Sequence, residues 1–492
     1  MLFADAFVED CTMQPFVEPA LGELHRPSRL TGKQQFRVLR PLLAVCMLLW
    51  VALYNGYPTI FSDTGSYLYA GAFFVEFPPF RSPGYSLFTK LTSLGISGWF
   101  TIAMQAVVMV YVLDKACGYL LGGKRKFCDN YVLAAVGTLA IFTSLPWVVS
   151  LLMPDFFAGI VFLSAFLLAF DGQSGVLERI CLAVILLISV SAHASLLPIA
   201  GLYFGALLLR RLAGRTLKGI PSTASMLGWL LVPIVAAGFC TATQNHKMGL
   251  GFRLSPSKNV FLLAMLFDDG LAADFLHENC PKQQFVACRY VACLPRSGGE
   301  FLYKHPLLHD LTGHEDEMGS IVRGTLSAYS GRFITSSIKR TVLQLGTIRT
   351  GDEIRSYGER PWNAAVVHQV FPVDFASFLD SRQSRGQLLT LANTFATIHT
   401  TIFWLSVVTC LALGWTSRIA RMNQFLCFAI VFLIINAAVC ATLSGVFDRY
   451  QSRVAWIIPL CLTVQIACLA RERKLTLRQG ERLERETFGC PG

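Results

Sequence analysis

Long hydrophobic runs without charged residues recur along the chain, separated by shorter polar segments. A helix crosses the roughly 30 Å hydrocarbon core of a bilayer with about 20 apolar residues, and several runs approach that length. We therefore expect an all-α polytopic membrane protein with about ten transmembrane helices. The expected spans are residues 39–57, 97–113, 131–150, 155–170, 180–192, 194–209, 225–243, 389–413, 425–443 and 454–470.

The segments between these runs define the expected domains. A long insertion, 244–388, mixes Gly, Pro and charged residues with apolar pieces too short to span a membrane, such as NVFLLAMLF (259–267). Within it, residues 331–346 place apolar residues at near-helical spacing with basic residues between them, which fits a helix on the membrane surface or in a soluble subdomain. The other parts are a cytosolic arm (1–38), a transmembrane module (39–243) with its first outer loop at 58–96, C-terminal transmembrane helices (389–470) and a cytosolic tail (471–492).

Residues 180–209 fit one long helix or two short ones. A single helix would be about 45 Å long and would carry the basic stretch RRLAGRTLKG (210–219) to the outer side. Basic loops favour the cytoplasmic side. We therefore expect two short spans joined by a hinge at SAHAS (191–195).

Composition and charge support this class. Apolar residues make up 53% of the 492 and charged residues only 15%, against about 25% charged in an ordinary soluble domain. Of the 42 lysines and arginines, 22 fall in segments that share the N-terminal side, and at most four fall in the short outer loops. This asymmetry puts both termini in the cytoplasm. It also explains most of the net charge of +11, so no nucleic-acid partner is expected.

Cysteine is frequent, with 15 residues, most of them inside the expected spans, where cysteine packs as a small apolar side chain. Cys280, Cys288 and Cys293 cluster in the insertion. An oxidising compartment would allow one disulfide among the three.

The first outer loop carries the first candidate for chemistry, in FSDTGSYLYAG (61–71). Asp63 could cap a short helix that runs through Tyr67, or it could face a cavity as a general base or metal ligand. FPPFRSPGYSLF (77–88) follows, in which prolines and glycine turn the chain and Arg81 offers a planar cation suited to phosphate.

Asp155, in LLMPDFFAGIVF (151–162), begins a span at the same outer level as Asp63. An aspartate in the first turn complements the helix dipole, which is a sufficient structural role. Two carboxylates at one level could also share a divalent cation, Mg²⁺ or Mn²⁺, with a phosphate ester.

Three other residues face the same side. His193 lies in the hinge at 191–195, where it is either a hydrogen-bonded hinge residue or part of a site. Arg449 and Arg453, in SGVFDRYQSR (444–453), could hold a lipid phosphate, although Asp448 and Arg449 could equally form a local pair. KHPLLHDLTGHEDE (304–317) is rich in histidine and acids, but its spacing fits no defined metal motif.

Taken in order, the acid of the first outer loop, RSPGYSLF, MPDFFAG and DRYQSRVAWIIPL resemble the GT-C superfamily of multi-span glycosyltransferases that use polyprenyl-phosphate sugars. The resemblance covers residues 39–243 in order and 389–470 more loosely. It implies a GT-C-like fold that holds a polyprenyl-phosphate sugar donor and a lipid or glycan acceptor among membrane lipids. The location implied is a bacterial inner membrane.

The resemblance also implies roles for individual residues. Asp63 would be the catalytic base of an inverting transfer, and Asp155 would help to bind a divalent metal, with or without Asp63. Arg81 and Arg449 would hold the donor phosphate, together with Arg453. Tyr67 and His193 would line the substrate cavity.

The chain departs from the common GT-C layout by carrying its insertion between the seventh and eighth spans, and its first loop holds no DE or DD pair. Metal dependence is therefore left open. The main alternative function is a membrane transporter or lipid flippase, which would favour ionisable groups near mid-span. An acyltransferase would need a histidine deep in a span, and His399 is the candidate.

Overall fold

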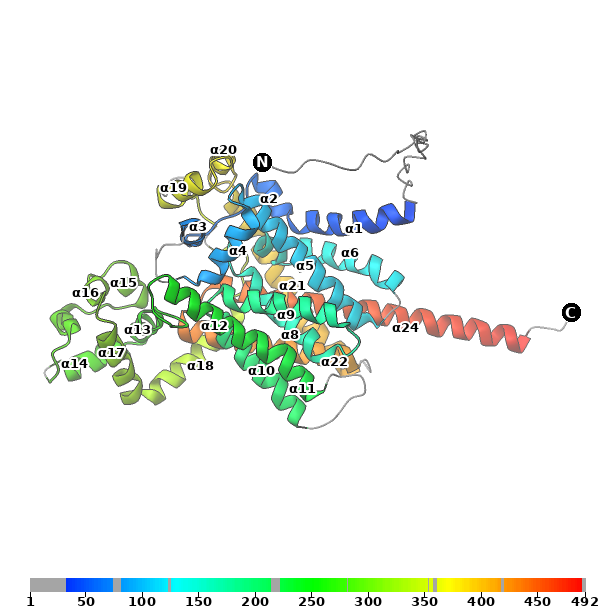
Figure 1. Cartoon of the computed structure of the whole chain (residues 1–492). Helices are drawn as coiled ribbons and strands as arrows, with labels where there is room; N and C mark the ends of the chain where they lie inside the picture. The colour runs from blue at the N-terminus through cyan, green and yellow to red at the C-terminus, as the bar shows by residue number, and fades with distance from the viewer. Residues whose placement is uncertain are drawn as a thin grey trace, which may run out of the picture. The chain divides into compact units, whose positions relative to one another are not determined.

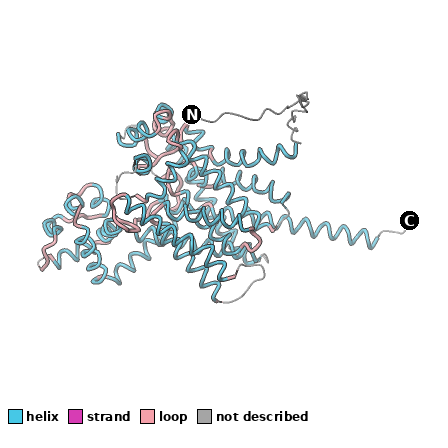
Figure 2. The backbone as a smooth tube through the Cα atoms, in the orientation of Figure 1, coloured by secondary structure: helices cyan, strands magenta, loops and turns pink. Residues whose placement is uncertain are grey.

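The computed structural model is built from helices throughout its described residues, 78% of which are helical (Figures 1 and 2). In that part of the chain the sole β contact is an isolated bridge between Thr59 and Leu151. The chain divides into two units between Arg40 and Pro41, and apart from the start of the first helix everything described below belongs to Pro41–Gly492. The structure describes residues 32–73, 81–122, 125–213, 222–280, 282–352, 354–356, 361–416 and 420–488. The expected arm at 1–38 lies almost entirely outside them.

Every expected span coincides with helical structure. The helices are α1 (Gly32–Leu48) and α2 (Trp50–Asn55), α5 (Gly98–Leu121), α6 (Arg125–Phe142) with α7 (Leu145–Val149), α8 (Phe156–Phe170), α9 (Val176–Ala192), α10 (Leu196–Leu212), the continuous α11 (Thr223–Met226), η1 (Leu227–Leu231) and α12 (Val232–Lys247), α21 (Leu388–Thr416), α22 (Ala420–Leu443), α23 (Asp448–Ala455) and α24 (Ile457–Phe488).

Five helical segments in the described part are long and apolar enough to cross a membrane: Gly98–Leu121, Thr223–Lys247, Leu388–Leu413, Ala420–Leu443 and Asp448–Arg471. The α-helical membrane class is therefore confirmed. Ten crossings stay a prediction, because several other expected spans are shorter apolar helices, such as α8. The chain does turn between α9 and α10, at His193–Ser195, where the hinge was expected.

Helix α8 lies at the centre of the packing. All fifteen of its residues are buried, as expected for a helix that is apolar on every side. It packs against α5, α9, α10 and α23. At Gly159 a Cβ atom would lie 2.3 Å from the ring of Trp456, the residue between α23 and α24. Only glycine lets α8 approach this junction so closely.

The insertion is helical and has a hydrophobic core of its own, which includes Phe267, Phe301 and Leu311. The prediction for 331–346 is met by α18, which packs along α22 and leaves Ile334, Ile338 and Val342 exposed. The helices of the insertion are α13 (Lys258–Asp268), α14 (Leu271–Asn279), η2 (Val286–Cys293), α15 (Gly298–Tyr303), α16 (Leu307–Leu311), α17 (Glu315–Ala328), α18 (Ser330–Gly346), α19 (Pro361–Val370) and α20 (Phe375–Asp380).

The last part of the insertion returns to the first outer loop, which carries α3 (Thr64–Phe73) and α4 (Pro83–Ser93). The Gln383 side chain exchanges two hydrogen bonds with the backbone of Ile60, at 3.0 and 2.7 Å. The Asn363 side chain accepts the amide of Gly65 at 3.1 Å. These contacts hold the loop in place from a segment about 300 residues away in sequence.

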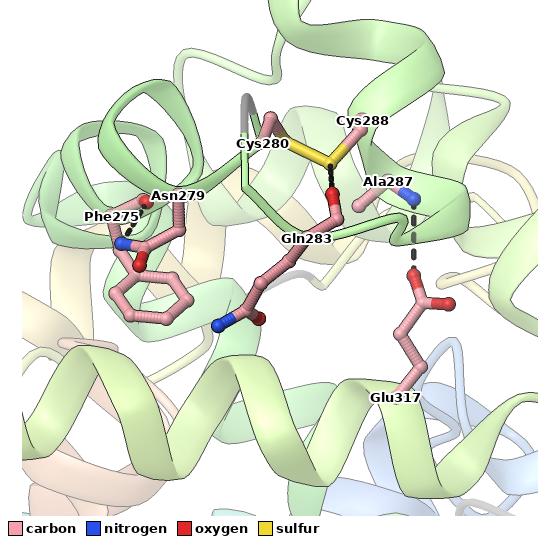
Figure 3. Close-up of a disulfide and its surroundings, with 7 residues drawn as sticks. All are labelled: Phe275, Asn279, Cys280, Gln283, Ala287, Cys288 and Glu317. Atoms are coloured by element: carbon pink, nitrogen blue, oxygen red, sulfur yellow. Dashed lines mark hydrogen bonds between the residues drawn. A yellow bond between two sulfur atoms is a disulfide. The ribbon is translucent and has the colours of Figure 1, made fainter.

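A disulfide joins Cys280 to Cys288 at the end of α14 (Figure 3). Beside it, the carboxylate of Glu317 on α17 accepts the amide of Ala287 at 3.0 Å. Cys293 remains a free, exposed thiol. The sequence allowed one disulfide among the three clustered cysteines, and the structure forms it between Cys280 and Cys288.

Replacing Cys288 with serine is expected to lower the free energy of unfolding of the insertion by about 2–3 kcal/mol, because a crosslink across a short loop restricts the unfolded chain. The exposed Cys293→Ser variant is the matched control and should behave as the wild type. Rates of limited proteolysis of the purified protein, with and without reductant, measure the difference. Equal protection in both variants would show that the disulfide adds no stability.

Candidate functional site

A cavity of about 1080 Å³ is lined by residues at the ends of the membrane helices and by residues of the insertion. Five of the seven residues selected from the sequence line it: Asp63, Tyr67, Arg81, His193 and Arg449. The other two, Asp155 and Arg453, form a buried pair linked to it through Ser195. The structure therefore brings together side chains from four separate parts of the sequence.

Asp63 binds two arginines. One carboxylate oxygen accepts a hydrogen bond from Nη2 of Arg81, and the other lies 3.5 Å from Nη1 of Arg449. Its backbone carbonyl accepts the amides of Ser66 and Tyr67 in the first turn of α3. The capping interpretation had the side chain of Asp63 accept these amides, whereas its backbone carbonyl accepts them and its carboxylate faces the two arginines.

The RSPG stretch fixes where Arg81 lies. Pro83 occupies the first turn of α4, where proline is favoured. The hydroxyl of Ser82 donates to the carbonyl of Ser191 at 2.6 Å, and a Cβ at Gly84 would lie 2.1 Å from that same carbonyl. Glycine is required by this contact between α4 and the end of α9, and the contact holds Arg81 beside the hinge.

Arg449 lies at the start of α23, with its guanidinium 4.4 Å from the ring centre of Phe61 and 4.9 Å from that of Tyr450. Such cation–π contacts stabilise a partly buried cation. Its backbone amide donates to Asp352 at 3.2 Å. Asp448, the alternative partner, accepts the amide of Arg349 at 2.7 Å, and Arg449 points to Asp63.

Arg453 is one helical turn beyond Arg449 and is fully buried. Its Nη1 donates to Asp155 at 3.2 Å, and its Nη2 donates to Asn436 at 2.9 Å and to Ser195 at 3.3 Å. These partners come from the start of α8, from α22 and from the hinge before α10. A buried arginine needs such partners because an unpaired charge away from water is costly.

These contacts show where Arg453 and Asp155 lie. Arg453 binds internal partners and is not among the residues that line the cavity. Asp155 likewise pairs with an arginine. Among the described residues, Nε of Arg81, Nη1 of Arg449 and Nε of Arg453 are buried donors without a hydrogen-bond partner. Arg81 and Arg449 line the cavity, whereas Arg453 lies behind it.

His193 lines the cavity. Its Nδ1 lies 2.8 Å from the hydroxyl of Ser195, a contact within the hinge itself. Burial, together with the charges of Arg453, Arg449 and Arg81, lowers the pKa of His193 to about 3 although Asp155 opposes the shift. The imidazole is therefore neutral at physiological pH. Tyr67 is buried at the cavity wall, with its ring 5.3 Å from Tyr85 in an edge-to-face contact, and burial raises the pKa of its phenol.

The donor set does not fit a divalent metal. Asp63 and Asp155 each face an arginine, and the described residues contain no group of three or more His, Cys, Asp or Glu side chains suited to hold an ion. The histidine-rich stretch 304–317 contains no such group either. His399 lies in α21, bonded to Thr350 at 2.9 Å, apart from the residues that line the cavity.

Sequence reasoning missed several residues of the site. Asn436, which binds Arg453, lies in an uncharged helical run that gives no local signal. Ser195, its other partner, lies in the expected hinge but was not selected as a site residue. Asp269 and Arg340 from the insertion also line the cavity. Neither was found because the fold of the insertion against the helices was not predictable from spacing.

No protein-family model matches the chain, and neither a curated protein nor a solved structure matches it. Its function therefore has to be argued from the site itself.

Asp155→Asn is expected to lower the free energy of unfolding by about 3–5 kcal/mol, because it leaves the buried Arg453 without its counter-charge. Asp274→Asn, which breaks an exposed aspartate–arginine pair with Arg332, should cost no more than about 1 kcal/mol. Tryptophan fluorescence during denaturation in detergent reports the loss, since the Trp456 indole donates to the Arg453 carbonyl. Similar losses in the two variants would contradict a structural role for the buried pair.

The His193 pKa makes stability depend on pH. An unfolded histidine titrates near 6.5, so below that pH the unfolded chain takes up a proton that the folded chain refuses until about pH 3. Wild-type stability relative to His193→Gln should therefore fall as the pH drops from about 6.5, by at most about 1.4 kcal/mol per pH unit. Melting curves of both proteins between pH 8 and 4 measure it, and a pH-independent difference would show that His193 titrates normally.

Proposed function

We propose that this protein is an integral-membrane glycosyltransferase of the GT-C type, transferring a sugar from a polyprenyl-phosphate donor to a hydroxyl acceptor. The observation that carries the proposal is the Asp63 carboxylate held between Arg81 and Arg449 at the wall of a large cavity. On the expected topology, this cavity is at the outer face of the membrane. A lipid-linked donor would present its phosphodiester at that level.

The two arginines suit a phosphate. A guanidinium presents several N–H donors in a plane and binds phosphate oxygens bidentately. Nε of Arg81 and Nη1 of Arg449 are buried and have no hydrogen-bond partner among the described residues, although Nη1 of Arg449 lies 3.5 Å from the Asp63 carboxylate. A phosphate oxygen would satisfy these donors. A phosphate arriving there would compete with Asp63 for the two cations.

That competition gives Asp63 its role in the proposal. With the arginines drawn to the phosphate, a carboxylate oxygen becomes free to accept the proton of the acceptor hydroxyl. The acceptor oxygen attacks the anomeric carbon as the bond from that carbon to the phosphate oxygen breaks. The arginines stabilise the departing phosphate, and a single displacement inverts the anomeric centre.

The proposal does not need a metal ion, because arginines occupy the positions beside both acids. Mg²⁺ or Mn²⁺ therefore has no step in it, and Asp155 acts by holding Arg453 rather than as a metal ligand. A bacterial inner membrane and cytoplasmic termini belong to the same proposal. They rest on the distribution of basic residues and on the resemblance to GT-C enzymes.

The test is native mass spectrometry of lipids that co-purify with the protein in mild detergent. The wild type is expected to retain polyprenyl phosphate or its glycosylated form. Arg81→Gln and Arg449→Gln should each lower that occupancy about ten-fold, the effect of losing a charge-assisted hydrogen bond. Asp63→Asn should keep the donor with its sugar intact, because only the transfer step is blocked.

Asp171→Asn is the matched control, because Asp171 follows the far end of α8 and lies outside the cavity. It should retain the same lipids as the wild type. Failure of every protein to retain a polyprenyl lipid would remove the main support for glycosyl transfer. Assays of transport or lipid flipping would then test the alternative function.

A further inference from the structure

The cavity continues beyond Asp63 into the insertion. Its far wall is formed by Lys258, Asp268 and Asp269 from α13 and the residue after it, by Tyr303 at the end of α15 and by Arg340 of α18. The donor chemistry proposed above uses none of these residues. They are the polar and aromatic groups that a second ligand in the same cavity would meet.

Asp269 and Arg340 form a pair that is nearly closed to solvent, with side-chain exposures of 9% and 12%. Nη1 of Arg340 donates to one oxygen of Asp269, and its Nε donates to the carbonyl of Ala441 at 3.1 Å, which ties α18 to α22. The second oxygen of Asp269 is buried and has no hydrogen-bond partner among the described residues. Such an oxygen is rare in folded proteins and calls for a donor.

Two further groups flank this pair. Asp268 is exposed at the wall, and its Oδ1 accepts the amide of Gly298 at 2.7 Å, which fixes the carboxylate. A Cβ at Gly298 would lie 2.6 Å from the carbonyl of Ala264, so this contact requires glycine. Tyr303 exposes 81% of its surface, which leaves its ring accessible to a flat apolar ligand face.

This set of groups matches the chemistry of a saccharide. Neighbouring hydroxyls of a sugar donate to carboxylate oxygens and accept from guanidinium or ammonium groups, and the apolar face of the ring packs on an aromatic side chain. A purely hydrocarbon ligand would leave the second oxygen of Asp269 without a donor. Because this wall carries both acidic and basic side chains, its charge does not favour an anionic ligand.

We propose that the insertion end of the cavity is a saccharide subsite built from Asp268, Asp269, Arg340 and Tyr303. This proposal rests on the proposed function. The subsite would bind the glycan part of the acceptor, and the sugar would be transferred to it from the donor held beside Asp63. A free glycan and the glycan headgroup of a lipid share this chemistry. The experiment below separates the two sources.

The fluorescently labelled full-length protein in detergent is applied to an array of immobilised mono- and oligosaccharides, and lipids that co-purify with the same samples are measured by native mass spectrometry. The wild type is expected to bind saccharides on the array or to carry a glycolipid. Tyr303→Ala and Asp269→Asn should weaken that binding about ten-fold or more. Tyr303 is exposed, so its replacement leaves the fold intact even if Asp269→Asn does not.

Asp274→Asn is the matched control, because Asp274 also pairs with an arginine of α18, Arg332, but lies outside the cavity. It should bind as the wild type does. Binding on the array assigns the ligand to a free glycan, and a glycolipid lost from the variants assigns it to a lipid headgroup. Either result supports the subsite.

Two results would overturn the subsite: a wild type that binds neither kind of saccharide, or binding that Tyr303→Ala and Asp269→Asn leave unchanged. The polyprenyl lipid in the same spectra judges the proposed function separately. If that lipid is present while saccharides are not bound, the proposed subsite is wrong and the proposed polyprenyl-phosphate donor is supported. If saccharide binding is lost in the variants but no protein retains polyprenyl phosphate, the subsite is supported and the proposed donor is wrong.

Discussion

The buried contact between Arg453 and Asp155 is the constraint on which the rest of the site depends. Both side chains are almost completely removed from water, and such burial is tolerable only where the opposite charge and further hydrogen-bond partners are in place. Satisfying Arg453 therefore fixes α23 against the start of α8, the hinge before α10 and Asn436 of α22. The pair specifies an arrangement of helices more than it adds free energy.

This frame places the reactive end of the cavity. Arg449 precedes Arg453 by one helical turn, so both project from the same face of α23. With Arg453 held inward, Arg449 meets Asp63 on the first outer loop. The loop is itself held from the other side by Gln383 and Asn363 of the insertion. Two aspartate–arginine contacts thus lie on one helix, one structural and one open to the cavity.

The insertion closes the cavity and changes its chemistry. Asp63 pairs with Arg81 and Arg449 at one part of the cavity wall. The insertion adds a second ion pair to the lining, between Asp269 and Arg340. The same segment carries the disulfide, between Cys280 and Cys288. A crosslinked subdomain with its own core can hold polar groups against the membrane helices more firmly than a loop could.

The sequence by itself determined the membrane class, the positions of the helices, the hinge at His193 and five of the residues that line the cavity, because apolar runs and isolated charges beside them are local signals. It also predicted that Asp63, Arg81 and Arg449 lie on the same side of the membrane, but not that Asp63 pairs with both arginines. Only the tertiary structure decided that Arg453 turns inward, that Asp155 pairs with it and that Asp269 joins the cavity. Those outcomes depend on contacts between segments as much as 300 residues apart, and no local pattern records which buried charge will find which partner.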